Sequence, residues 1–79
     1  MTARQAFPVG IPPPAVLEEQ ELKHNTGYAW IPGFWRWNGI SHVWVKGRLV
    51  AGREGYIYVP EQWIATNGRW VFHAGRWER

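Results

Sequence analysis

Short segments that alternate a ring-bearing residue with a small aliphatic one recur from residue 28 onward. The first is Tyr28-Ala29-Trp30-Ile31. The others are His42-Val43-Trp44-Val45, Tyr56-Ile57-Tyr58-Val59 and Trp70-Val71-Phe72. Because successive side chains of a strand point to opposite faces, this alternation predicts β-strands with rings on one face and small residues on the other. The chain beyond Gly27 is therefore expected to be all-β.

The segments are copies of one repeat. Their first residues, Tyr28, His42, Tyr56 and Trp70, stand fourteen positions apart, and each opens an eight-residue segment that begins ring-x-ring. The sixth position is glycine in three segments and the eighth is tryptophan in three: Gly33, Gly47 and Gly75, and Trp35, Trp63 and Trp77. A short internal repeat indicates one structural unit used several times. The function is then expected to belong to a repeated surface rather than to a single catalytic cluster.

Turn signals arrange these segments in pairs. Asn38-Gly39 and Asn67-Gly68 each lie between two segments and favour type I′ turns, which need positive φ at both central residues. They predict two hairpins, at about 28–50 and 56–78, joined by the loop 51–55.

Proline interrupts the first and third segments at equivalent positions. Pro32 and Pro60 cannot donate a ladder hydrogen bond, so these strands are either sheet edges or are bent by bulges. The sixth-position glycines favour bulges. We therefore expect a small, strongly twisted and curled four-stranded antiparallel sheet built from the two hairpins.

The N-terminal part has a different composition. Residues 1–14 are rich in proline and are expected to be extended, whereas 15–24 are compatible with a short helix or an edge strand. This predicts an extended arm over 1–24 and a repeat domain over 25–79.

Length and charge narrow the classes of function. Seventy-nine residues without cysteine are near the lower limit for a chain that folds alone, so apolar burial, self-association or a partner must stabilise it. The net charge of +3 favours anionic partners but is far from that of a basic nucleic-acid tail. No stretch has the length of a membrane span, and the N-terminus lacks the apolar region of a signal peptide. The latter fits either a processed mature form or a cytosolic protein.

The repeat also resembles a known family. Trp30-Ile31-Pro32-Gly33-Phe34-Trp35 matches the pattern of the bacterial YXWGXW or WXXGXW repeat family, which includes the BcpO-related proteins. The three later segments keep part of the pattern, and the resemblance covers about residues 27–78. It implies an envelope protein of a Gram-negative bacterium, in the periplasm or outer envelope, and brings no enzymatic activity or substrate with it.

Rings and arginines are the candidate binding residues. Most rings are expected to form the core of so small a domain, with a minority left for a ligand, and Trp37 beside a turn is the leading candidate. Arginines interleaved with rings are typical of single-strand nucleic-acid platforms, but equally of cation–π packing and solvated strand faces. The candidate ligand- or partner-binding residues are Trp37, Trp35, Trp63, Trp77, Arg36, Arg48, Arg69 and Arg76.

Catalytic and metal chemistry find no support in the sequence. His24, His42 and His73 lack ligand spacing, and there is no Asp or Cys to complete a site. Glu54 and Glu61 are not paired at a defined separation, and no glycine loop for phosphate is present. We therefore expect no enzyme, no metal and no cofactor.

The sequence favours a binding or scaffold module that associates with itself or docks on a larger protein through aromatic surfaces. Two alternatives stay open. A glycan module would contact cell-wall or capsular polysaccharide, with little dependence on salt. A single-strand nucleic-acid module, which the modest charge disfavours, would lose affinity steeply with salt.

Overall fold

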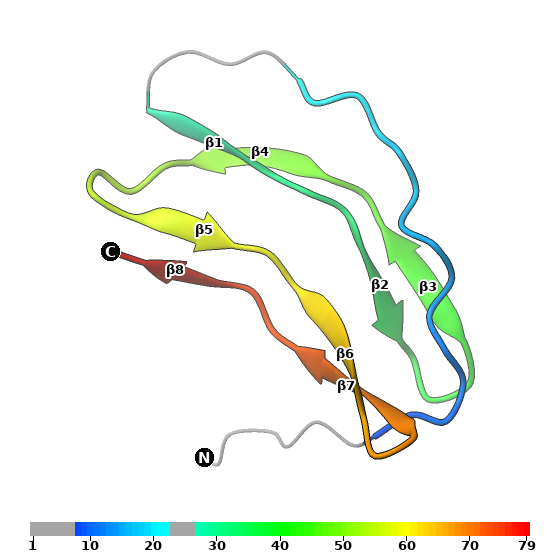
Figure 1. The fold of residues 1–79 in the computed structure, drawn as a ribbon. Coiled ribbons are helices and arrows are strands. Elements are labelled where there is room, and N and C mark those ends of the chain that lie inside the picture. Colours follow the sequence, from blue (N-terminus) through cyan, green and yellow to red (C-terminus); the bar gives the residue numbers. More distant parts are fainter. Residues whose placement is uncertain (1–7, 23–26) are drawn as a thin grey trace.

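The structure, a computed structural model, describes residues 8–22 and 27–79. These residues form eight short strands and no helix, which confirms the all-β prediction (Figure 1). The strands are β1 (Tyr28–Ile31), β2 (Phe34–Trp37), β3 (His42–Val45), β4 (Arg48–Ala51), β5 (Ile57–Val59), β6 (Gln62–Thr66), β7 (Arg69–His73) and β8 (Arg76–Glu78).

The strands pair within two long hairpins. In the first, over residues 28–51, β1 pairs with β4 and β2 with β3; in the second, over 57–78, β5 pairs with β8 and β6 with β7. All four pairings are antiparallel. The two-hairpin prediction is therefore confirmed.

Each hairpin is interrupted once, at the same level on both of its strands. In the first hairpin Ile31 lies opposite Arg48 and Phe34 opposite Val45, so each strand leaves out two residues. The second hairpin repeats this between Val59 and Gln62. A bulge would put an extra residue in one strand only. The predicted bulges are therefore wrong, because the ladder breaks without any change of register.

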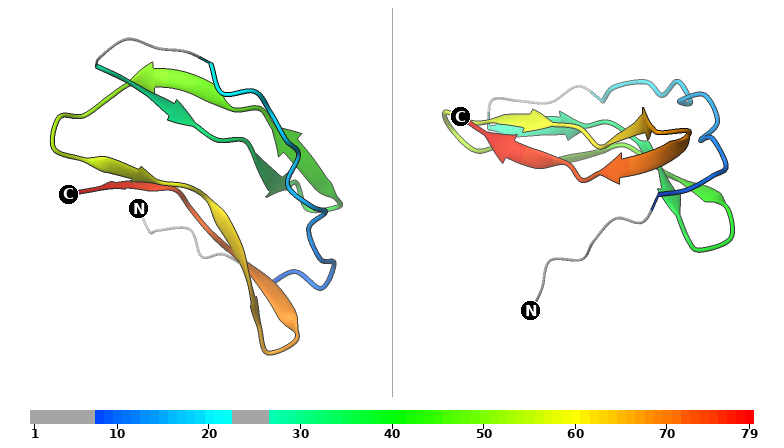
Figure 2. Two further views of the ribbon diagram at one scale, coloured as in Figure 1. Left: turned by 45° about the horizontal axis from the view of Figure 1, so that its top comes forward. Right: turned by 60° about the horizontal axis from the view of Figure 1, so that its bottom comes forward.

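The predicted single four-stranded sheet is also wrong. The described strands make four separate two-stranded sheets, and none of these is curled or closed. The two hairpins lie beside each other (Figure 2). Side chains join them. The rings of Phe34 and Phe72 are 5.8 Å apart, and the Trp63 indole N–H donates to the Trp35 carbonyl at 2.8 Å. Contacts between rings and this hydrogen bond therefore join the hairpins in place of a ladder between their edges. The Trp35 carbonyl is an acceptor that a neighbouring strand would otherwise use.

One of the two hairpin turns has the predicted type I′ conformation and the other does not. Asn67 and Gly68 both have positive φ and form the two-residue turn that type I′ requires. In the first hairpin the Asn38 amide donates to the Ser41 carbonyl, so the central residues are Gly39, which has positive φ, and Ile40, which does not. Only the first of these two central residues has positive φ, so the turn is not the type I′ turn that the sequence predicted. The Asn38 side chain instead accepts the amides of Ile40 and Ser41, each at 2.8 Å.

The core is very small. Among the described residues only Ile31 and Val9 are buried apolar side chains, with 1% and 7% of their surface exposed. All seven tryptophans keep part of their surface in solvent. The rings therefore make an incomplete core.

Residues 8–22, which we call the arm, run extended along the hairpins (Figure 1). Over 15–22 the chain forms neither the helix nor the edge strand left open by the sequence, and 23–24 lie outside the described residues. Val9 is the one arm residue in a ladder, where it faces Trp70 of β7. The arm is thus placed against the repeats by individual contacts.

Candidate functional site

The sixth-position glycines of the repeat lie beneath rings of the opposite strand. A Cβ atom added at Gly33 would collide with the Trp44 indole, and one added at Gly47 would collide with the Trp30 indole. In the second hairpin a Cβ atom at Gly75 would collide with the Tyr58 ring. Each glycine therefore provides space for the third-position ring of the segment with which it pairs.

Third-position rings of the repeat also meet the eighth-position tryptophans. Ring centroids are 5.1 Å apart for Trp35–Trp44, 5.2 Å for Tyr58–Trp77 and 5.1 Å for Trp63–Phe72, and each pair is directly opposed in the register. Two residues that are two apart share one face of a strand, so one ring of the paired strand covers both the glycine and the tryptophan. The spacing ring-x-x-Gly-x-Trp thus marks the two positions, glycine and tryptophan, that a ring of the opposite strand contacts. In the fourth pair Leu49 faces Trp30.

Glu61 stands at the sixth position of the third segment, where the other three segments have glycine. The Tyr58 hydroxyl donates to its Oε2 atom at 2.9 Å, while its Oε1 atom is buried without a partner among the described residues. Burial raises the pKa of Tyr58, and the hydrogen bond and charge of Glu61 raise it further. The second hairpin thus carries a partly buried carboxyl group beside its break.

Side chains of the first hairpin hold the backbone of the arm. The Trp35 indole N–H donates to the Ala15 carbonyl at 3.1 Å. His42 Nε2 lies 2.9 Å from the Ile11 carbonyl, which can only accept, so Nε2 carries the proton and the buried Nδ1 has no partner among the described residues. Both of these donors therefore bind the backbone of the arm rather than a side chain.

A carboxylate completes the attachment. The Trp44 indole N–H donates to Glu19 Oε2 at 2.7 Å, and the Gly47 amide donates to Glu19 Oε1 at 2.8 Å. The Trp44 bond, then the Gly47 bond, and to a lesser degree the charge of Lys46 lower the pKa of Glu19, although slight desolvation opposes them. We call the surface formed by Trp35, His42, Trp44 and Gly47 the arm groove.

The acceptors that the arm groove binds are evenly spaced along the arm. They belong to Ile11, Ala15 and Glu19, four residues apart. At the far end Val9 and Trp70 exchange two backbone hydrogen bonds, at 2.7 and 2.8 Å. The arm therefore touches both hairpins and spans the molecule in one extended stretch.

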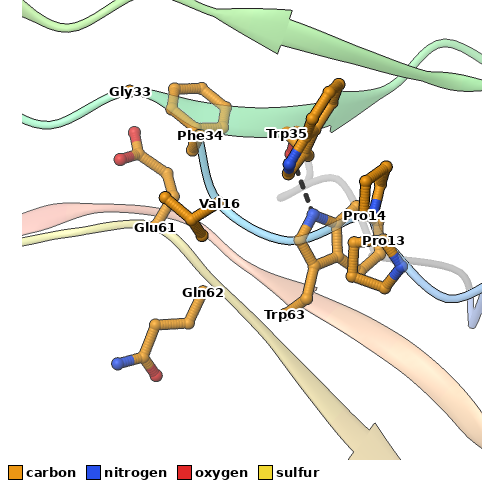
Figure 3. Close-up of a pocket in the computed structure, with 9 residues that line it drawn as sticks. All are labelled: Pro13, Pro14, Val16, Gly33, Phe34, Trp35, Glu61, Gln62 and Trp63. Carbon is orange, nitrogen blue, oxygen red and sulfur yellow. Dashed lines mark hydrogen bonds between the residues drawn. The ribbon is translucent and has the colours of Figure 1, made fainter. Parts of the chain in front are cut away.

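A cavity of about 380 Å³ lies between the arm and the hairpins (Figure 3). Pro13, Pro14 and Val16 line it from the arm, and Trp35 and Trp63 line it from the hairpins, together with Gly33, Phe34, Glu61 and Gln62. Its walls are largely apolar. The bond from Trp63 to the Trp35 backbone crosses it in Figure 3.

A second cavity, of about 490 Å³, lies at the opposite ends of the strands. Its lining residues are Gly27, Ala29, Gly52, Arg53, Glu54, Tyr56 and Trp77. The Arg53 guanidinium is 5.8 Å from the Tyr56 ring and 6.0 Å from the Trp77 ring, and that of Arg79 is 5.0 Å from Tyr56. Two rings and two cations therefore meet around this opening.

The tryptophans singled out from the sequence fall in different places. Trp35 and Trp63 line the first cavity and Trp77 lines the second. Trp37 packs edge-on against His42, with centroids 4.9 Å apart, and lines neither of the two.

The arginines singled out from the sequence, Arg36, Arg48, Arg69 and Arg76, are all exposed and line neither cavity. Arg76 pairs with Glu78 at 2.6 Å. Among the described residues, the arginines placed over rings are Arg53 and Arg79, which the sequence analysis did not single out. It also missed Glu19, for which no motif gives a signal.

The described residues contain no group of three side chains that could hold a metal ion, and His24 lies outside them. In the same residues no helix is long and apolar enough to cross a membrane.

A model of the WXXGXW repeat matches the chain in two copies, over residues 25–48 and 53–78. The chain belongs to the WXXGXW repeat family. Each copy falls on one hairpin, so the unit of this family is a pair of the fourteen-residue segments rather than a single one. The match carries no link to the BcpO-related proteins. No curated protein and no solved structure is similar enough to this chain to add to the assignment.

Proposed function

We propose that this WXXGXW protein is a non-enzymatic scaffold module that associates with itself or docks on a larger protein through aromatic and apolar surfaces. The incomplete core carries this proposal. Only Ile31 and Val9 are buried apolar side chains among the described residues. Apart from Ile40 on the first turn, eight large apolar side chains are exposed instead: Ile11, Val16, Leu17, Leu22, Tyr28, Tyr56, Ile57 and Ile64. Apolar surface left in water on this scale favours contact with another protein surface.

The strand pairing supports the same proposal. Each sheet in the described part of the chain has two strands, so each strand presents one edge outside its ladder. An isolated two-stranded hairpin is only marginally stable in water, and open edges are templates for pairing with another chain. Further burial through association would stabilise the hairpins and cover these edges.

Sedimentation velocity over a wide concentration range, combined with iodide quenching of tryptophan fluorescence, tests the proposal. We expect a concentration-dependent oligomer whose tryptophans become less accessible as it forms. A folded monomer at the highest concentration, with tryptophans equally accessible throughout, would contradict self-association and direct attention to a separate protein partner.

Glycan binding is the second candidate, and the second cavity favours it. The partly exposed Trp77 ring and the exposed Tyr56 ring can stack on a sugar ring, while Arg53 and Arg79 can bind its carboxylate. Titration with uronic-acid and neutral oligosaccharides, followed by tryptophan fluorescence, tests it. Binding that Trp77→Ala abolishes and Trp37→Ala preserves would support this site, and no spectral change with either sugar would contradict it.

The expected location and the nucleic-acid alternative have separate tests. The family resemblance suggests the periplasm or outer envelope, which fractionation of the producing cell would check. Single-strand nucleic-acid binding through Trp and Arg would weaken steeply between low and moderate salt. The four arginines singled out from the sequence line neither cavity, so this alternative has less support than the first two candidates.

A further inference from the structure

The arm groove binds features that any copy of the chain supplies. Trp35 and His42 donate to backbone carbonyls of the arm. Glu19 is the only arm residue that the groove binds through its side chain. We propose that the arm is exchanged between copies, so that residues 8–22 of one chain occupy the arm groove of a second chain and the reverse. This inference rests on the proposed self-association and specifies how it occurs.

The attachment of the arm is suited to exchange because it depends on hydrogen bonds more than on buried side chains. Val9 is the only buried side chain of the arm. Ile11, Val16, Leu17 and Leu22 remain 48 to 71% exposed while the arm is in place. Detaching the arm therefore uncovers only one buried side chain of the arm itself, which makes a local opening of this segment easier than opening of a packed element.

Each chain offers one arm and one groove. The tryptophan donors of the first hairpin, Trp35 and Trp44, have no free equivalents in the second, where Phe72 replaces Trp44 and has no N–H group. Trp63 replaces Trp35, but its indole N–H is already bound to the Trp35 carbonyl. A pair related by a two-fold axis would thus satisfy both arm grooves with two arms.

Protein concentration determines whether the arm occupies the groove of its own chain or that of a second copy. The arm makes the same contacts in the groove of its own chain and in that of a second copy. Tethering therefore favours the groove of its own chain, with an effective concentration on the order of millimolar. New contacts between the copies must offset this, and the exposed apolar residues of the arm are the groups placed to make them. The exchanged form should therefore increase with protein concentration.

Cysteine pairing tests the exchange directly, because the chain has no cysteine of its own. Val9 and Trp70 exchange two backbone hydrogen bonds, and such a pair has Cα atoms about 5.5 Å apart, within the range that a disulfide spans. Full-length V9C and W70C chains would be mixed, oxidised mildly with diamide and separated on a non-reducing gel. A mixture of V9C with I40C, which places the thiol on a turn residue that is 82% exposed, measures random collisions.

Exchange predicts a V9C–W70C heterodimer that exceeds the V9C–I40C product several-fold and increases with concentration. Equal amounts of the two products would overturn it. The double variant V9C/W70C should likewise give a covalent dimer at high concentration. A covalent monomer at every concentration would overturn arm exchange, and if sedimentation still showed a dimer, the proposed self-association would stand through another surface.

A measurement on the unaltered chain covers the case in which W70C does not fold. Isotope-filtered NMR on an equal mixture of labelled and unlabelled chains would detect contacts between Val9 of one copy and Trp70 of the other. We expect such intermolecular contacts in the associated protein. Contacts confined to single chains in a sample that sedimentation shows to be dimeric would overturn the exchange.

Discussion

At the scale of single residues, the glycines of the repeat are required for space rather than for backbone conformation. Gly33, Gly47 and Gly75 are absent from the residues with positive φ, which include Gly39 and Gly68 at the turns. What the three share is a ring of the opposite strand where a Cβ atom would be. Their role could not be predicted from the sequence, where a glycine at this position of a strand equally indicates a left-handed bulge.

Gly33→Ala tests this interpretation. The new methyl group would meet the Trp44 ring and lie 2.7 Å from the Val45 carbonyl oxygen, part of the backbone. We expect a loss of about 1–3 kcal/mol of unfolding free energy, the usual effect of overpacking. Gly10→Ala is the matched control, because nothing lies within 4 Å of its added Cβ and its φ is not positive. Denaturant unfolding of both variants measures the difference, and equal effects would contradict the packing role.

Tyr58→Phe isolates the hydroxyl group over Glu61. The ring stays in place, but Glu61 loses the only partner of its carboxyl group among the described residues, so we expect a loss of about 1–3 kcal/mol. Tyr56→Phe is the control, because the Tyr56 hydroxyl makes no hydrogen bond in the described structure. Urea unfolding at neutral pH compares the two, and a Tyr58→Phe variant as stable as Tyr56→Phe would contradict the role of this bond.

The same hydroxyl predicts how stability depends on alkaline pH. Burial raises the pKa of Tyr58 in the folded protein above its ordinary value of 10.0. Its contribution to stability is therefore complete below pH 10 and is lost as the pH rises through the folded pKa. Unfolding curves between pH 8 and 12 should show this loss in the wild type and a smaller loss in Tyr58→Phe. Parallel curves for the two proteins would rule out the contribution.

At the scale of elements, alternation and turn residues predicted the hairpins but not how the hairpins are interrupted or docked. The strands and the Asn67-Gly68 turn depend on local preferences, which a sequence displays. The break beside Pro32 keeps the register only because the facing strand breaks at the same level, at Lys46-Gly47. The docking of the hairpins depends on a bond from Trp63 to a backbone carbonyl 28 residues away, for which no pattern exists.

The attachment of the arm should respond to acid. Hydrogen bonds from Trp44 and Gly47 hold the pKa of Glu19 below its ordinary value of 4.5. The attachment is therefore complete above pH 4.5 and is lost as the pH falls through the folded pKa of Glu19. NMR of the Trp44 indole N–H from pH 6 to 2 should show one transition, starting below pH 4.5.

Two substitutions decide whether Glu19 causes that transition. Glu19→Gln should abolish it, because the side chain no longer titrates. Glu18→Gln should leave it unchanged, since the Glu18 carboxylate makes no hydrogen bond in the described part of the chain. A Trp44 signal that titrates equally in both variants would show that another group is responsible.

At the scale of the whole molecule, the candidate site was predictable only where the repeat marks it. The ring pairs of Trp35, Trp63 and Trp77 follow from the fourteen-residue spacing. The arm groove does not, because it joins one carboxylate of a non-repeated segment to two donors more than twenty residues away. The arginines that contact rings lie in a loop and at the end of the chain, where no periodicity applies.

Self-association through the apolar surface predicts that charge placed on a strand will act more strongly than charge placed on a turn. Ile57 on β5 is 69% exposed, and Ile40 on the first turn is 82% exposed. Burial of an isoleucine side chain contributes about 1.5–3 kcal/mol, and each 1.4 kcal/mol changes an affinity tenfold. Ile57→Glu should therefore weaken dimerisation at least tenfold in sedimentation equilibrium. Ile40→Glu makes the same change in net charge and should have little effect, so equal weakening by both variants would attribute association to net charge rather than to the apolar surface of the hairpins.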